Sequence, residues 1–200
     1  MTSRDFFARD TSTVARELLG MRLVRLESGR RLSGLIVEAE AYRGEEDQGC
    51  HARAGLTPRT RVMYGPPGHA YVYFTYGMHW MLNFVTEPEG FPAAVLIRAI
   101  FPTEGLDVIA SRRDGQPFER WTDGPAKLCR ALDIDGRHHG LDLCAPQAEL
   151  FIEQGEPVPD SAVTIGPRIG LNNVPEPWKS IPWRYIWKKE SRDLRENREL

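Results

Sequence analysis

The residues best suited to chemistry lie in one short stretch, residues 36–51, which reads IVEAEAYRGEEDQGCH. If residues 35–42 form an extended strand, its side chains alternate between two faces, and Glu40 and Tyr42 point to the same side. A half-buried carboxylate beside an aromatic ring has a raised pKa, which suits it to general acid or base catalysis. His51 follows after a turn that contains glycine and acidic residues. The stretch therefore predicts a site built around one carboxylate.

Strict alternation also puts Ile36 and Glu38 on the Glu40 side of this strand. An isolated glutamate on a strand is more often a solvated surface residue, so that interpretation competes with catalysis. Arg98 favours the catalytic interpretation, because it interrupts residues 93–100, AAVLIRAI, a run with the pattern of a strand buried on both faces. A buried arginine needs a carboxylate partner. Glu40 is one candidate for that partner, and Glu38 is the other.

Length and composition predict one globular domain over residues 1–200. The chain has 41% hydrophobic and 27% charged residues, which are ordinary values for a folded domain. Its three cysteines have neither close pairing nor metal-ligand spacing, which indicates a reducing compartment, by default the cytoplasm, and argues against disulfides or a zinc site. The sequence has no signal-peptide core and no uncharged apolar run of membrane-spanning length, so we expect no membrane partner.

Charge is unevenly distributed along the chain, although a net charge of −2 does not by itself indicate nucleic-acid binding. No acidic residue lies between Asp47 and Glu87, and basic and aromatic residues are interleaved in that interval. Such a stretch can supply phosphate contacts and base stacking together, so we expect Arg53, Arg59 and Arg61 to contact a nucleic-acid backbone. The alternative is a β-rich core with a solvated loop, and composition alone does not separate the two.

Hydrophobic periodicity and turn residues predict the elements that position these side chains. The hairpin-type connections favour an α/β (α+β) fold with a curved, mostly antiparallel sheet flanked by short helices. Asp10 or Thr11 is expected to cap the first helix and Asp123 the last. Residues 43–69 are rich in glycine and proline and are expected to form an ordered loop. We expect strands at residues 21–27, 31–42, 70–76, 81–85, 93–100, 149–153 and 162–165, and helices at about residues 11–19, 102–113 and 123–132.

The expected hairpin of residues 70–76 and 81–85 carries Tyr76 and Met78 at its tip. An exposed apolar tip of this kind has the shape of a wedge that can enter a base step. The alternative is an aromatic plug packed against a neighbouring loop. Alternation along the first strand groups Tyr71, Tyr73 and Thr75 on one face.

Five segments, in this order and spacing, carry a resemblance to a known family: VEAEAYRGEEDQGCH, TPRTRVMYGPPGHAYVYFTYGMHWMLN, AVLIRA, DGPAKLCRAL and PRIG. Together they resemble the alkyladenine (3-methyladenine) DNA glycosylases, over an ordered core of about residues 5–192. The resemblance implies a base-excision-repair enzyme that flips a damaged purine out of duplex DNA and hydrolyses its N-glycosidic bond. It also implies damaged double-stranded DNA as the partner, with no cofactor, no metal and no lysine nucleophile. We expect a monomer without an obligate protein partner.

Carried over position by position, the resemblance implies that Glu40 is the general base that activates water. Arg98 would orient both that water and Glu40. Tyr42 and His51 would sandwich the extruded base, and Tyr73 would contribute to the same pocket.

The resemblance also covers the hairpin tip and the base pocket above it. Tyr76 would fill the gap that the extruded base leaves in the stack, with Met78 beside it, and Asn83 would exclude the 2-amino group of guanine. Cys50 departs from the family pattern, in which a smaller residue is expected. Residues 114–122 match no segment of that pattern, so their DNA contacts are unassigned.

The chemistry of alkylated purines fits a site with a single carboxylate. Alkylation at N3 or N7 puts positive charge on the purine, so the leaving group is already activated and water needs only to be placed. An electron-rich ring such as Tyr42 attracts a cationic base by about 1 to 2 kcal/mol when desolvated. Two alternatives stay open: a non-catalytic nucleic-acid-binding module on the same scaffold, and a metal-dependent hydrolase that uses Glu40 and His51.

Overall fold

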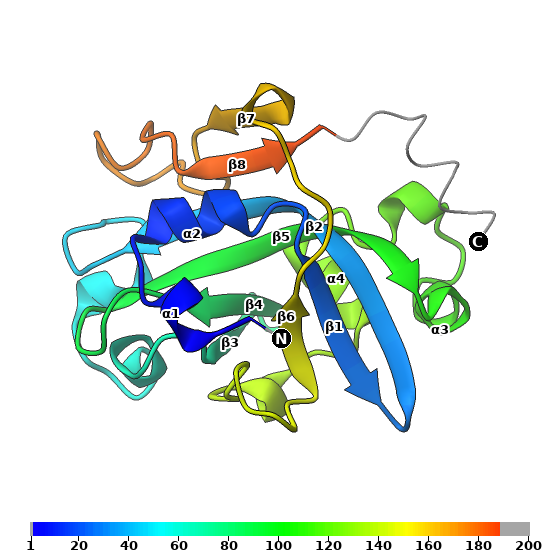
Figure 1. The fold of residues 1–200 in the computed structure, drawn as a ribbon. Helices are drawn as coiled ribbons and strands as arrows, with labels where there is room; N and C mark the ends of the chain where they lie inside the picture. Colours follow the sequence, from blue (N-terminus) through cyan, green and yellow to red (C-terminus); the bar gives the residue numbers. More distant parts are fainter. Residues whose placement is uncertain (1, 189–200) are drawn as a thin grey trace.

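The computed structural model describes residues 2–188 and is built on an eight-stranded sheet with the order β3-β4-β5-β2-β1-β6, to which β8 and β7 are added beside β2. Each pairing between these strands is antiparallel. The fold is therefore the mixed α/β architecture with a mostly antiparallel sheet that the sequence predicted (Figure 1). The strands are β1 (Arg22–Glu27), β2 (Arg30–Arg43), β3 (Ala70–Thr75), β4 (His79–Val85), β5 (Ala93–Glu104), β6 (Leu150–Glu153), β7 (Val163–Gly166) and β8 (Arg184–Trp187).

Short helices cover this sheet. Of the two N-caps predicted for α2, Asp10 is confirmed and Thr11 is the first helical residue, because the Asp10 carboxylate accepts a hydrogen bond from the Thr13 backbone N–H at 3.0 Å. In Figure 1, α2 crosses in front of β2 and β5, and Val14 and Leu18 join the main hydrophobic core there. Within the described residues, no helix is long and apolar enough to cross a membrane. The α-helices are α1 (Arg4–Phe7), α2 (Thr11–Glu17), α3 (Leu106–Arg112) and α4 (Pro125–Ala131).

Strand β2 is the centre of the sheet. One edge pairs with β5, and the other pairs first with β1 and then with β8. The strict alternation predicted for β2 is wrong at Ile36, which lies in the hydrophobic core together with Ala39 instead of on the Glu40 side. On β5, Ile97 and Ile100 also share that core while being three residues apart. The reason is a pair of register shifts between Ile36 and Ala39, which interrupt the alternation of both strands at the same level.

Two predicted helix starts are wrong. The helix expected from residue 102 begins at Leu106, because Pro102 continues β5 and pairs with Gly34 beside a register shift, where a strand tolerates proline. The N-cap of α4 is Gly124, and the Asp123 carboxylate instead accepts a hydrogen bond from Lys127 Nζ at 2.7 Å. Pro125 occupies the first turn of α4, as expected.

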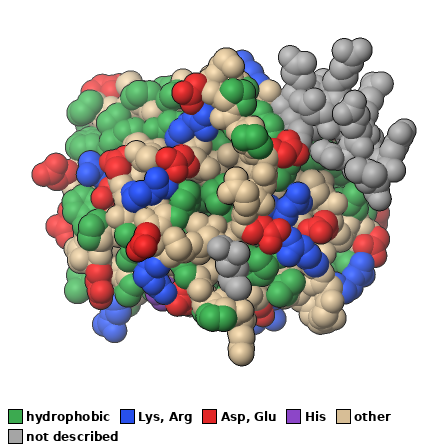
Figure 2. All heavy atoms as spheres, viewed as in Figure 1, with side chains coloured by type: hydrophobic (Ala, Val, Ile, Leu, Met, Phe, Trp, Pro, Cys, Tyr) green, Lys and Arg blue, Asp and Glu red, His purple; other side chains and the backbone are tan. Residues whose placement is uncertain are grey.

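The sequence did not predict β8, which pairs with the part of β2 that contains Glu38 and Glu40 (Figure 1). The loop expected over residues 43–69 contains only two short 3₁₀ turns, at His51–Ala54 and Arg61–Tyr64. The final residues 191–200, expected to be frayed or weakly helical, lie outside the described residues. Figure 2 shows acidic and basic side chains interspersed over one face of the molecule, as the small net charge implies.

Candidate active site

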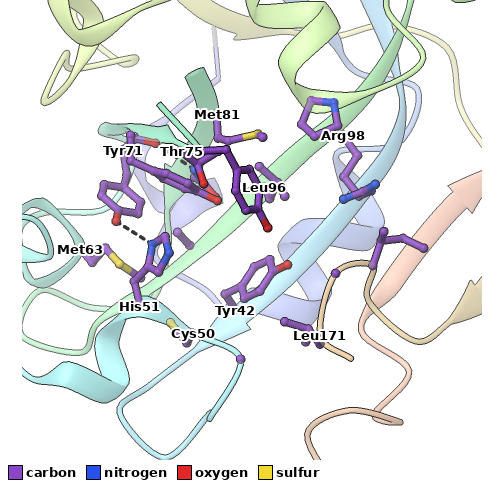
Figure 3. Close-up of a pocket in the computed structure, with 18 residues that line it drawn as sticks. Tyr42, Cys50, His51, Met63, Tyr71, Thr75, Met81, Leu96, Arg98 and Leu171 are labelled. Atoms are coloured by element: carbon purple, nitrogen blue, oxygen red, sulfur yellow. Dashed lines mark hydrogen bonds between the residues drawn. The ribbon is translucent and has the colours of Figure 1, made fainter. Parts of the chain in front are cut away.

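A cavity of about 290 Å³ opens on the face of the sheet opposite the hydrophobic core (Figure 3). Strand alternation creates it. On β5, Ala94, Leu96 and Arg98 line the cavity, while Val95 and Ile97 belong to the core. The loops at residues 49–51 and 169–171, the hairpin of β3 and β4, and the first residue of α4 complete the wall.

Glu40 lies behind this wall and is completely buried. Its carboxylate accepts hydrogen bonds from three sides: the Tyr42 hydroxyl at 2.8 Å, the Ile169 backbone N–H at 2.6 Å and Arg98 Nη1 at 3.4 Å. Tyr42, Ile169 and Arg98 all line the cavity, so the carboxylate is bonded to three groups of the cavity wall. The predicted convergence of Glu40 and Tyr42 on one side of β2 is confirmed.

Burial raises the pKa of Glu40 above its ordinary value of 4.5. The charge of Arg98, the Ile169 N–H and the Tyr42 hydroxyl act in the opposite direction, because each stabilises the carboxylate form. Burial also raises the pKa of Tyr42, which keeps the phenol protonated and able to donate to Glu40. The result is a carboxylate that is a stronger base than a solvated one.

Arg98 contacts both of its candidate partners. Its Nε donates to Glu38 Oε1 at 2.9 Å, which is shorter than its 3.4 Å contact with Glu40. Glu38 also accepts a hydrogen bond from Arg184 Nη1 of β8 at 3.3 Å. The main ion pair of Arg98 is therefore with Glu38. This pair holds the guanidinium beside Glu40, so the positive charge of Arg98 is shared between two carboxylates.

Aromatic rings form the other side of the cavity. The His51 ring lies 4.6 Å from the Tyr73 ring, centroid to centroid, and His51 Nδ1 is 2.9 Å from the Tyr71 hydroxyl (Figure 3). Burial, followed by the charges of Arg59 and Arg53, lowers the pKa of His51 to about 4. The imidazole is therefore neutral at pH 7 and presents an uncharged ring to the cavity.

The role of Tyr71 was missed by the sequence analysis, although its position on the same face as Tyr73 and Thr75 was predicted and is confirmed. Tyr71 is 2% exposed and pairs with Asn83 across the β3–β4 hairpin. Asn83 Nδ2 donates to the Tyr71 carbonyl at 3.0 Å, which fixes the amide at the cavity wall. A hydroxyl at the correct distance from a histidine ring is a tertiary contact that sequence spacing does not show.

The hairpin tip is exposed. Tyr76 is 85% exposed and Met78 67% exposed, which is inconsistent with the alternative of an aromatic plug packed on a neighbouring loop. Tyr76 has a φ of +52°, a left-handed conformation that is unusual for a bulky residue. It also lines the mouth of the cavity. Its insertion into DNA stays a prediction.

Arg53, Arg59 and Arg61 are exposed at the surface near the cavity. Arg53 Nη1 donates to the Gln48 carbonyl at 2.9 Å, so part of its bonding capacity is used locally. Arg59 lies over the Tyr73 ring, 5.0 Å from its centroid, with Nη2 3.4 Å from His51 Nε2. Arg59 and Arg53 therefore lie close to His51, and contacts of the three arginines with a DNA backbone stay a prediction.

Glu40 and His51 have separate partners, which does not match a shared metal site. Among residues 2–188, no group of three or more His, Cys, Asp and Glu side chains could hold a metal ion. Cys50 is buried beside His51, and burial raises the pKa of its thiol to about 12. The thiol is therefore protonated at neutral pH and fills space in the pocket floor with Ala52 and Met63.

The sequence pattern does not predict that the loop at residues 168–171 lies at the cavity. Gly170 and Leu171 line the cavity beside Ile169, and Arg168 forms a buried ion pair with Asp47. The available signal was an arginine in the PRIG segment and an aspartate that closes an acid-rich turn, but 121 residues separate the two. No local pattern joins residues at that distance.

These features together define a class of site: a buried carboxylate behind an aromatic-walled cavity, an arrangement suited to binding a flat ring and acting beside it by general base catalysis. The sequence comparison identifies the family. The model of the methylpurine-DNA glycosylase family matches residues 5–191, and the chain belongs to this family.

Relatives from three organisms support that assignment, and each carries the name "putative 3-methyladenine DNA glycosylase". The protein from Myxococcus xanthus is 49% identical over 189 residues, covering 94% of this chain and 90% of the relative. The protein from Carboxydothermus hydrogenoformans is 46% identical, with 92% and 94% covered. The protein from Methanocella arvoryzae is 48% identical, with 92% and 91% covered.

Proposed function

We propose that this protein is a monofunctional DNA glycosylase that removes alkylated purines from duplex DNA by hydrolysing the N-glycosidic bond and leaves an abasic site. The observation that carries the proposal is the completely buried Glu40 carboxylate, held by Tyr42, Arg98 and Ile169 directly behind the cavity. Family membership supplies the class of reaction, and this geometry supplies a residue that can perform it.

In this proposal the flipped base enters the cavity and is held between the rings of Tyr42 and His51, with Tyr73 at the edge. In Figure 3 the rings of Tyr42 and His51 are separated by open space. A neutral His51 avoids charge repulsion with a cationic base, and Tyr42 adds cation–π attraction. Damaged bases are also easier to unstack than normal ones, so flipping itself favours the lesion.

The chemical step needs one water molecule. Glu40 takes a proton from that water while the water oxygen bonds to C1′ of the deoxyribose. The bond between C1′ and the purine breaks, and its electron pair leaves with the base, which neutralises an alkylated purine cation. Arg98, held by Glu38, orients the carboxylate and the water, and the negative charge of Glu40 stabilises the positive charge that develops on the sugar.

Asn83 acts as the gatekeeper against normal guanine in this proposal. Its amide nitrogen is already bonded to the Tyr71 carbonyl, so the side chain cannot rotate freely to accommodate a 2-amino group. We propose 3-methyladenine as the main substrate, with 7-methylguanine, hypoxanthine and etheno-adenine as further candidates. The last two are neutral, so their release requires protonation of the leaving base.

The surface around the cavity is proposed to bind damaged duplex DNA as a monomer. Tyr76 and Met78 at the exposed hairpin tip fill the gap that the flipped base leaves. Arg53, Arg59 and Arg61 contact phosphates beside the cavity mouth. This surface needs only one copy of the chain.

The test is single-turnover base release from duplexes that carry 3-methyladenine, 7-methylguanine or hypoxanthine, with a chelator present. We expect release by the wild type and none by Glu40→Gln, with DNA binding retained. Release that stops in chelator would favour the metal-dependent alternative. Tight binding by both proteins without any release would favour the non-catalytic binding module.

A further inference from the structure

Arg168 and Asp47 form an ion pair in which both side chains have zero exposure. Arg168 Nη1 lies 2.5 Å from Asp47 Oδ2, and Nη2 lies 2.8 Å from Oδ1, so the contact is bidentate. The same guanidinium donates to the backbone carbonyls of Ala41 and Trp178, at 3.0 and 3.2 Å. Four contacts to three segments of the chain fix its position.

This fixed cation lies over two aromatic rings. The guanidinium carbon lies 4.6 Å from the centroid of Tyr42 and 5.1 Å from that of Trp183. Tyr42 lines the cavity, whereas Arg168 is buried and does not. One face of the Tyr42 ring is therefore occupied by a cation, which leaves the other face for a base in the cavity.

A ring attracts a cation through the negative charge of its π face. A cation already bound to one face draws that charge toward itself, and it also repels a second cation across the ring, because neither charge is screened by water in a buried site. We infer that Arg168 sets the charge preference of the base pocket: through the ring of Tyr42, it weakens the attraction for cationic bases relative to neutral ones. The inference rests on the proposed function.

Asp47 moderates this effect. Its carboxylate partly cancels the field of the guanidinium. The charge preference of the wild-type pocket therefore lies between that of a pocket with an unpaired guanidinium behind Tyr42 and that of a pocket with no charge there. Removing the negative charge alone exposes the Tyr42 ring to an uncompensated cation, whereas removing both charges frees the ring from it. The two changes break the same ion pair but move the charge preference in opposite directions, which a purely structural role of the pair would not do.

The test compares Asp47→Asn with the double variant Asp47→Asn/Arg168→Met, both made on Glu40→Gln so that bound lesions stay intact. The measurement is the affinity for duplexes with 7-methylguanine, a cation, and with hypoxanthine, a neutral base, each divided by the affinity for undamaged duplex. Arg43→Gln is the matched control, because Arg43 stacks on Phe91, outside the cavity, at 5.4 Å. Thermal unfolding shows whether each variant is folded.

We expect the ratio of cationic to neutral preference to fall on the order of fivefold in Asp47→Asn and to rise by a similar factor in the double variant, as one cation–π contact implies. The ratio should not change in Arg43→Gln. A ratio that moves in the same direction in both Asp47 variants, or does not move in either, would overturn the inference. Where the double variant does not fold, Asp47→Asn/Arg168→Gln replaces it and must raise the ratio. Where Asp47→Asn alone does not fold, the double variant must still raise the ratio above that of Glu40→Gln. Absence of base release by the wild type would instead refute the proposed function.

Discussion

Tyr71 and Tyr76 lie five residues apart on one hairpin and have opposite surroundings. Tyr71 is 2% exposed, and its hydroxyl and backbone carbonyl both bind neighbouring side chains. Tyr76 is 85% exposed and is held in a left-handed backbone conformation at the turn. The buried tyrosine belongs to a rigid pocket, whereas the exposed one has no packing reason to be aromatic.

The comparison separates two sources of specificity. The pocket is preformed, since Glu40, Arg98 and His51 already have their hydrogen-bond partners in the free protein. At the tip it is chiefly the backbone that is fixed, because the side chains of Tyr76 and Met78 are mostly exposed. We therefore expect changes in the pocket to affect chemistry or stability, and changes at the tip to affect the DNA-bound state alone.

Glu40→Gln should give the largest effect. The variant keeps the shape of the side chain but cannot take a proton from water, so single-turnover base release should fall by at least about a thousandfold. Binding to lesion-containing duplex should change little, which a gel-shift titration measures. Release within about tenfold of the wild type would show that another group activates water.

Acid should slow the reaction next most strongly. In the proposed mechanism Glu40 acts as an ionised carboxylate, and burial raises its pKa above 4.5, so base release should rise with pH through that raised pKa and level off above it. Below it, the rate should fall about tenfold per pH unit. The measurement is a single-turnover pH profile with 7-methylguanine. A half-maximal pH at or below 4.5 would contradict a desolvated carboxylate.

Tyr76→Ser should have a smaller effect, confined to DNA. Loss of the stacked ring at the tip should reduce base release from duplex by about tenfold to a hundredfold, because stacking is worth about 1 to 3 kcal/mol. The free energy of unfolding should change by less than about 0.5 kcal/mol. A large loss of stability would mean that the tip has a structural role after all.

Tyr71→Phe should give the smallest change in rate but a measurable loss of stability. His51 Nδ1 loses its hydrogen-bond partner in a buried position, which should cost about 1 to 2 kcal/mol in urea unfolding. Tyr76→Phe is the matched control and should leave stability unchanged. If both substitutions lowered the free energy of unfolding equally, the Tyr71 hydroxyl would have no special structural role.

Sequence reasoning predicted the parts of the site that depend on local periodicity. Glu40 and Tyr42 converge because they alternate on one strand, and the hairpin tip follows from its flanking strands. The Arg168–Asp47 pair could not be predicted, because it joins residues that only tertiary folding brings together. The helix expected from Pro102 was wrong for a related reason: pairing with β2 extends β5 through a position that local propensity assigns to a helix start.

The pairing of β2 with β8 has a consequence for the folding of the chain during its synthesis. The backbone of Glu40 pairs with β5 on one side and with β8 on the other, and the contact between Glu38 and Arg184 spans 146 residues. A nascent chain that lacks β8 therefore leaves the backbone edge of β2 at Glu38–Glu40 unpaired. Such an edge is a site for aggregation. The strand made late in synthesis therefore completes both the protection of this edge and the hydrogen bond between Arg184 and Glu38.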